Sequence, residues 1–139
     1  MPMRRGLVAL AVAAACCGTA AASASGAVRS GVTIHVKDVE QGTGTIHRLY
    51  GYVFSQRPRR CANHRSIGVF RQKGKKPDPR TDARIDYYQS RRVHGRYKWR
   101  ADEPRERIRA GKRYYAWMRN EYGCGGDLSR TIRVRGGSR

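Results

Sequence analysis

Short segments in which apolar and polar residues alternate are the feature that most constrains the fold of this chain. Val32, Ile34 and Val36 alternate with polar residues, and the run 45–55 is the longest β-prone stretch. A period of two places successive side chains on opposite faces of a β-strand. Because glycine and proline separate these runs, residues 31–135 are predicted to form an all-β antiparallel sandwich of about seven strands. The expected strands are residues 32–37, 45–55, 66–71, 83–90, 95–100, 112–119 and 130–135.

The alternation also indicates which side chains face the core. Leu49 and Val53 share one face of their strand, and Tyr97 and Trp99 form a natural pair of large core aromatics. The segment 91–94 is expected to be a loop. A further set of rings lies at outward positions, where they either stack on sugars or bases or cover the second sheet. This set is Tyr50, Tyr52, Tyr115 and Trp117.

The first 24 residues predict a cleaved export signal and therefore a secreted, extracellular protein. Arg4 and Arg5 precede a short apolar run, and the small residues Ala22, Ser23 and Ala24 suit a signal peptidase. About ten strongly apolar residues are too few to span a bilayer core, which needs roughly 20. Lipid attachment at Cys16 is a minor alternative. Residues 25–30 are expected to be a flexible lead and residues 136–139 a disordered tail.

Only two of the four cysteines, Cys61 and Cys124, follow the signal. In an oxidising compartment two cysteines are most simply one disulfide. The alternative is a metal site, but the pair lacks a CxxC motif and a paired histidine motif. We therefore expect a disulfide, with no metal and no cofactor.

The net charge of the chain predicts the sign of its partner's charge. The chain carries 30 Lys and Arg against 10 Asp and Glu, a formal net charge of +20, and only Arg4 and Arg5 lie in the signal. Such a field attracts polyanions. Arginine supplies 24 of the 30 cations, so a GC-rich codon supply is an alternative origin of the charge.

Three basic clusters are the candidate anion-binding residues. Loops at one end of a sandwich can converge, and arginine forks match phosphate and carboxylate geometry. The alternative is that they form a solvated surface without a specific ligand. The clusters are Arg57, Arg59 and Arg60; Lys73, Lys75 and Lys76; and Arg91 and Arg92.

Several of the strand and turn segments together resemble a known kind of domain. They are Gly51–Ser55, Cys61, Arg65–Arg71, Ser90, Gly95–Trp99, Gly111–Ala116, Cys124 and Thr131–Val134. In order and spacing they resemble small secreted actinobacterial domains that look like transthyretin-like and carboxypeptidase-regulatory-like sandwiches. The resemblance implies an Ig-like or transthyretin-like fold and export. It implies no activity, because the matched positions are core, turn or disulfide residues.

No motif specifies a reaction, so we expect a non-enzymatic protein. The leading hypothesis is that it binds an anionic polymer of the cell envelope or surroundings, or another exported protein. A small secreted nuclease is the enzymatic alternative, because a histidine beside a carboxylate such as Glu40 or Asp86 supplies acid and base chemistry. A structural spacer at the cell surface is a third possibility. The histidines in question are His35, His47, His64 and His94.

Overall fold

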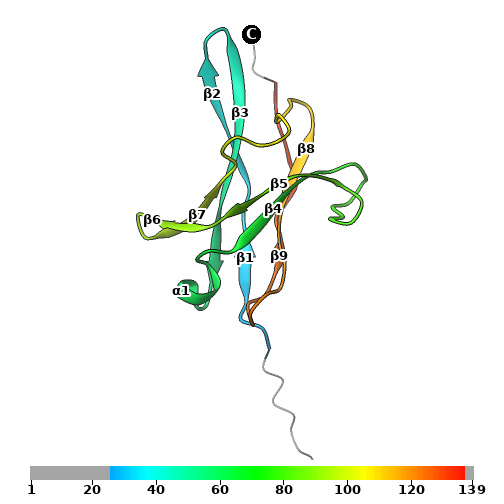
Figure 1. Cartoon of the computed structure of the whole chain (residues 1–139). Coiled ribbons are helices and arrows are strands. Elements are labelled where there is room, and N and C mark those ends of the chain that lie inside the picture. The colour runs from blue at the N-terminus through cyan, green and yellow to red at the C-terminus, as the bar shows by residue number, and fades with distance from the viewer. Residues whose placement is uncertain (1–25, 137–139) are drawn as a thin grey trace, which may run out of the picture.

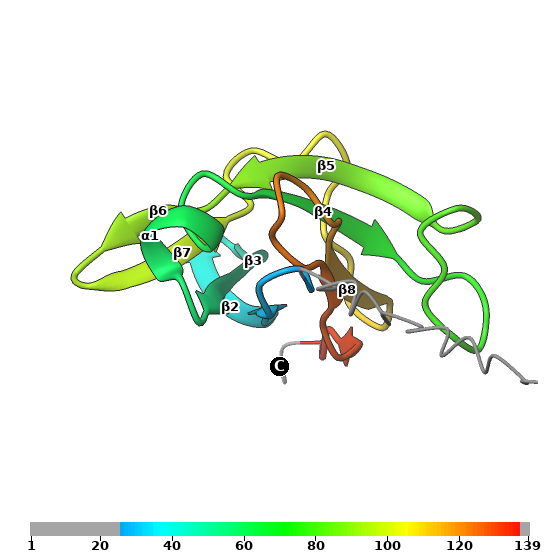
Figure 2. The ribbon, with the colours of Figure 1, turned by 90° about the horizontal axis from the view of Figure 1, so that it is seen from below.

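The fold consists of two packed antiparallel β-sheets, as seen in a computed structural model that describes residues 26–136 (Figures 1 and 2). The predicted signal, Cys16 and residues 137–139 of the predicted tail lie outside these residues. In the first sheet, β1 (Ser30–Val32) and β2 (His35–Gln41) pair with β3 (Gly44–Ser55), followed by β7 (Arg96–Arg100) and β6 (Arg91–Val93). In the second, β9 (Asp127–Leu128) and β10 (Ile132–Arg133) pair with β8 (Arg113–Met118), followed by β4 (Ser66–Arg71) and β5 (Ala83–Gln89).

The predicted all-β, sandwich-like architecture is confirmed, but the described residues form ten strands instead of seven. The expected first strand is interrupted at Thr33, whose carbonyl accepts a hydrogen bond of 3.0 Å from the Trp99 indole while its hydroxyl accepts one of 3.0 Å from the Tyr52 backbone N–H. The expected loop 91–94 is wrong, because Arg91–Val93 forms β6 and pairs with β7. The expected last strand is shorter, and β9 lies before it on the same edge of β8.

The core lies between the sheets where the alternation placed it. Leu49 and Val53 of β3 and Trp99 of β7 are buried, as are Ile67 and Val69 of β4. Each belongs to one continuous apolar cluster that both sheets contribute to. The opposite side of each strand therefore faces away from the core.

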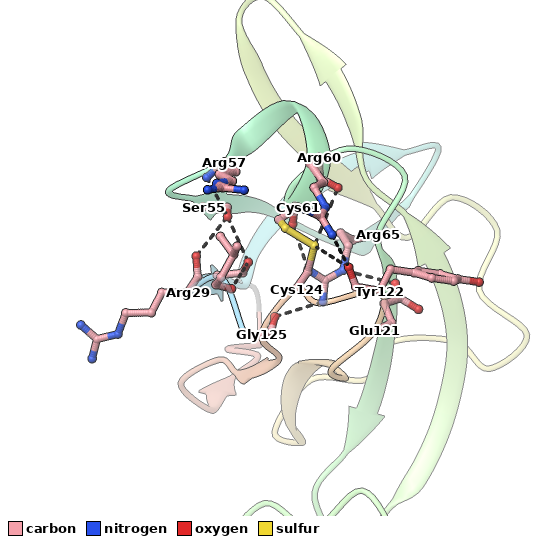
Figure 3. Close-up of a disulfide and its surroundings, with 12 residues drawn as sticks. Arg29, Ser55, Arg57, Arg60, Cys61, Arg65, Glu121, Tyr122, Cys124 and Gly125 are labelled. Atoms are coloured by element: carbon pink, nitrogen blue, oxygen red, sulfur yellow. Dashed lines mark hydrogen bonds and ion pairs between the residues drawn. A yellow bond between two sulfur atoms is a disulfide. The ribbon is translucent and has the colours of Figure 1, made fainter. Parts of the chain in front are cut away.

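One disulfide joins the two sheets at one end of the molecule (Figure 3). Cys61 ends α1 (Pro58–Cys61), a single helical turn after β3, where a loop was expected. Cys124 lies in the turn between β8 and β9. Their sulfur atoms are 2.01 Å apart and their Cα atoms 5.4 Å apart, which confirms the predicted pairing.

Arg65 fills the space beside this disulfide and is only 3% exposed (Figure 3). Its guanidinium donates hydrogen bonds to the carbonyl oxygens of Cys61 at 2.9 Å and Arg119 at 2.8 Å. It also pairs with the Glu121 carboxylate at 3.2 Å. Five donors in a rigid fork suit a site where several oxygens converge, so this arginine holds the turn and is not free for a ligand.

The loop after β4 contacts Tyr115 on the outer side of the second sheet. Asp82 accepts hydrogen bonds from the backbone N–H groups of Lys73 at 2.7 Å and Asp78 at 2.8 Å, and from the Tyr115 hydroxyl at 2.9 Å. Tyr115 is fully buried and stacks on Phe70. Tyr115 thus lies on the outer side of its strand, as the alternation predicted, and of the two alternatives for this ring it packs on the second sheet and is not open for stacking on a ligand.

Candidate polyanion-binding face

The outer side of the first sheet gathers cations and aromatic rings. Because Leu49, Val53 and Trp99 point into the core, the residues between them point outward. Strand pairing aligns these outward positions across β2, β3, β7 and β6. We call the resulting surface the cationic-aromatic face. It consists of His35, Lys37, Arg48, Tyr50, Tyr52, Phe54, Arg91, Arg96, Lys98 and Arg100.

Two parallel rows run along this face. Tyr50, Tyr52 and Phe54 occupy alternate positions of β3. In β7, Arg100 lies opposite Tyr50 and Lys98 lies opposite Tyr52. Hydrogen-bonded strands are about 4.8 Å apart, so each ring has a cation beside it.

Cation-π contacts connect the two rows. The Lys98 ammonium lies 4.8 Å from the centre of the Tyr50 ring and 6.0 Å from that of Tyr52. The Arg96 guanidinium lies 5.8 Å from the centre of the Tyr52 ring, and His35 stacks on Tyr50 at 5.3 Å. Such contacts are worth about 0.5–1 kcal/mol at exposed sites. The tyrosines therefore orient cations that would otherwise swing freely in water.

The face carries no compensating negative charge at its alternate strand positions. Asp38 of β2 is opposite His47, on the reverse side of the sheet. Asp102, just after β7, is the acidic neighbour and pairs with Arg100 at 3.3 Å. A hollow of about 290 Å³ lies over Tyr50, Tyr52 and Lys98. The described strands thus present a positive, slightly concave surface.

A second hollow, of about 480 Å³, adjoins the first and is lined by Tyr88 of β5 together with Arg91 and Lys98. The Tyr88 hydroxyl oxygen is buried and has no hydrogen-bond partner among residues 26–136. Burial, with smaller effects of Asp86 and Asp102, raises the pKa of Tyr88 to about 12. This tyrosine therefore lines the second hollow as a neutral group.

The predicted basic clusters do not all meet. Arg91 belongs to the cationic-aromatic face, whereas its neighbour Arg92 alternates to the other side of β6. Arg57 and Arg59 lie at α1, near the turn between β6 and β7, and Arg60 donates to the Tyr122 carbonyl at 3.2 Å. Both views place the loop containing Lys73, Lys75 and Lys76 on the opposite side of the molecule from α1 and β6 (Figures 1 and 2). Whether these clusters bind anions stays a prediction.

Sequence reasoning missed most cations of the face. Lys37, Arg48, Arg96, Lys98 and Arg100 are single charges within strands and not runs. These cations can be recognised because each faces outward beside an aromatic ring. That position can be assigned only when the register between the strands is known.

The four histidines do not form one catalytic group. His47 pairs with Asp38 at 2.7 Å, and not with Glu40. His94 lies in the turn between β6 and β7, and the pairing of β3 with β7 places it at the opposite end of the sheet from His47. His64 also lies in a turn, with a φ of 53°.

No protein-family model matches the chain, and no curated protein matches it as a relative. Among residues 26–136, histidine, cysteine and carboxylate side chains do not gather in threes as a metal site would require. Within the same residues, no helix has the length and apolar character needed to cross a membrane. The function of the protein is therefore inferred from its fold and from the cationic-aromatic face.

Proposed function

We propose that this protein is exported and acts without catalysis, by binding an anionic polymer at the cationic-aromatic face. One observation carries the proposal. Six Lys and Arg side chains lie on one face of the first sheet, and the outward-facing positions of its strands hold no Asp or Glu. Like charges so arranged raise the local concentration of a polyanion. Five of them, all except Arg100, have no carboxylate partner among the described residues.

The proposed setting is the cell exterior, and the proposed relatives are the transthyretin-like and carboxypeptidase-regulatory-like domains. The disulfide supports export, because such bonds persist in oxidising compartments. Mass spectrometry of the exported form tests it. An N-terminus near Ser25 and a mass two hydrogens below that of the dithiol are expected. Two free thiols in the exported protein would contradict the proposal.

Salt-dependent binding to heparin and to single-stranded DNA tests the face. We compare a variant combining Lys37→Ala, Arg48→Ala and Lys98→Ala with a control combining Lys73→Ala, Lys75→Ala and Lys76→Ala. Both lose three positive charges from different sides of the molecule. For the DNA, each phosphate contact contributes about 0.7 to the slope of log K against log salt, so the face variant should lower the slope by about 2.

The control variant is expected to change this slope much less. An equal loss in both variants would mean that the net charge of the whole molecule attracts polyanions and that the face does not. A larger loss in the control would move the site to the loop after β4.

The nuclease is a second candidate, supported by the His47–Asp38 pair. Asp38 also lines a hollow of about 530 Å³ together with Arg130, Arg133 and Arg135, and a histidine-carboxylate pair beside arginines suits phosphodiester chemistry. Incubation with RNA tests it, using His47→Ala. His94→Asn is the control, since asparagine tolerates the positive φ of 48° there. RNA left intact by the parent protein excludes this activity.

A further inference from the structure

We propose that the polymer is single-stranded nucleic acid, with phosphates along the cations of β7 and bases against the rings of β3. This inference rests on the proposed function and names the ligand class of the same face. Its basis is the alignment of two chemically different rows, Tyr50, Tyr52 and Phe54 beside Arg100, Lys98 and Arg96, and not the amount of positive charge.

The spacing of the rows favours an extended chain. Alternate residues of a strand are about 6.7 Å apart, and neighbouring strands about 4.8 Å. Each repeat along the face therefore offers one ring and, beside it, one cation. A ligand that uses both rows needs one planar group and one negative charge in each of its own repeats. A nucleotide has both.

The hydrogen-bonding character of the face argues against a sugar polymer. Lysine and arginine side chains donate hydrogen bonds and accept none. Apart from the hydroxyls of Tyr50 and Tyr52, the alternate positions of β3, β7 and β6 offer no side-chain acceptor, whereas sugar hydroxyls need acceptors as well as donors. Phosphate oxygens need only donors, and bases stack on rings without regard to sequence.

Stacking on these rings also requires bases that are unpaired. The rings project from a broad sheet, and base faces inside a duplex are covered by their neighbours. Phe54 is the freest ring of the row: its side chain lies over Gly31 and is 58% exposed. Lys98 lies over the tyrosine rings, so its movement toward a phosphate uncovers them for a base.

Fluorescence anisotropy with two labelled probes tests the inference. One probe is an oligothymidylate of about 12 nucleotides, within the roughly 4–16 nucleotides of a typical single-stranded site. The other is an abasic phosphodiester chain of equal length. Phe54→Ala should weaken binding of the first roughly 5- to 160-fold, the range for loss of one stacked base, and leave binding of the second nearly unchanged.

Tyr122→Asn is the matched control, because this ring is 88% exposed in the turn that holds Cys124, outside the strands of the face, and asparagine tolerates the positive φ there. Tyr52→Leu, which keeps an apolar side chain, provides a second variant, and urea unfolding verifies that each protein is folded. Equal binding of the two probes by the parent, or no effect of Phe54→Ala and Tyr52→Leu, would overturn the inference.

Those outcomes are distinct from failure of the proposed function. If loss of Lys37, Arg48 and Lys98 weakens binding while loss of the rings does not, the face binds polyanions by charge alone. If the ring variants weaken heparin binding more than oligothymidylate binding, the ligand is an anionic glycan. Preference for duplex over single-stranded DNA would also overturn the inference.

Discussion

At the scale of single residues, Gly51 connects the candidate face to the core. It lies between Tyr50 and Tyr52 on β3 and points inward, where the Thr33 carbonyl oxygen and the Trp99 indole nitrogen occupy the space that a Cβ would need. The same two groups share a hydrogen bond at the break between β1 and β2. The absence of a side chain at Gly51 thus allows Thr33 and Trp99 to approach each other across β3.

Gly51→Ala should therefore destabilise the protein by about 1–3 kcal/mol or more, the usual cost of overpacking a core. The contact is with backbone, which cannot rotate away. Urea unfolding measures the effect, and Gly44→Ala on the same strand is the control, because nothing lies within 4 Å of a Cβ there. Equal stabilities of the two variants would show that Thr33 and Trp99 can move aside.

Asp82 is the residue that makes stability depend on acid. Burial raises the pKa of its carboxyl, but hydrogen bonds from the backbone of Asp78 and Lys73, and from the Tyr115 hydroxyl, outweigh burial and hold the pKa below the ordinary value of 3.8. A carboxylate whose pKa is lowered by folding stabilises the fold above its unfolded pKa. That contribution is lost as the pH falls through the folded value.

Asp82→Asn should accordingly reduce stability at pH 7, and the difference from the parent should shrink below about pH 4. Urea unfolding of both proteins between pH 7 and pH 2 measures this. Asp102→Asn, an exposed carboxylate paired with Arg100, is expected to have a small effect. A difference that stays constant with pH would mean that Asp82 acts through packing alone.

At the scale of elements, the strands that alternate clearly could be predicted from sequence. Leu49, Val53, Ile67 and Val69 are buried as expected, because period-two alternation is determined locally. The strand β6 could not be found this way, since an exposed edge strand has no buried face to create a pattern. The one local feature that marks β6 is the His94–Gly95 turn that follows it, where both residues have positive φ, as a type I′ hairpin turn requires.

The candidate face was predictable only in part. The outward positions of Tyr50 and Tyr52 follow from alternation, but their proximity to Lys98 depends on the pairing of β3 with β7. Pairing between strands distant in sequence is a tertiary property that local patterns do not contain. The packing of a loop over a strand also depends on tertiary structure. For this reason the burial of Tyr115 could not be predicted from the local pattern.

The Cys61–Cys124 disulfide ties α1 to the turn before β9, and its loss should cost about 4 kcal/mol. That figure is the chain entropy of a closed loop whose ends are 63 positions apart. Urea unfolding of a Cys61→Ala, Cys124→Ala double variant measures it, with the reduced parent as the control. A loss below about 1 kcal/mol would indicate that Arg65 and its carbonyl partners hold this turn without the bond.

At the scale of the whole molecule, the charge of +20 on 139 residues has opposite consequences for folding and for binding. Five arginines pair with carboxylates among residues 26–136, so most cations repel one another. Compaction brings these charges together, which destabilises the folded state. The same uncompensated charge is what draws a polyanion to the face.

Added salt should therefore raise the stability of the protein while lowering its affinity for oligothymidylate. Between about 0.05 and 0.5 M NaCl, screening shortens the reach of repulsion to less than 10 Å, and the urea midpoint should rise. Over the same range the log of the binding constant should fall linearly with log salt. Sodium chloride suits both measurements, because sulfate also stabilises proteins by exclusion from their surface. A midpoint that falls with salt would mean that the attraction within the ion pairs of Arg65, Arg71 and Arg105 outweighs the repulsion among the remaining cations.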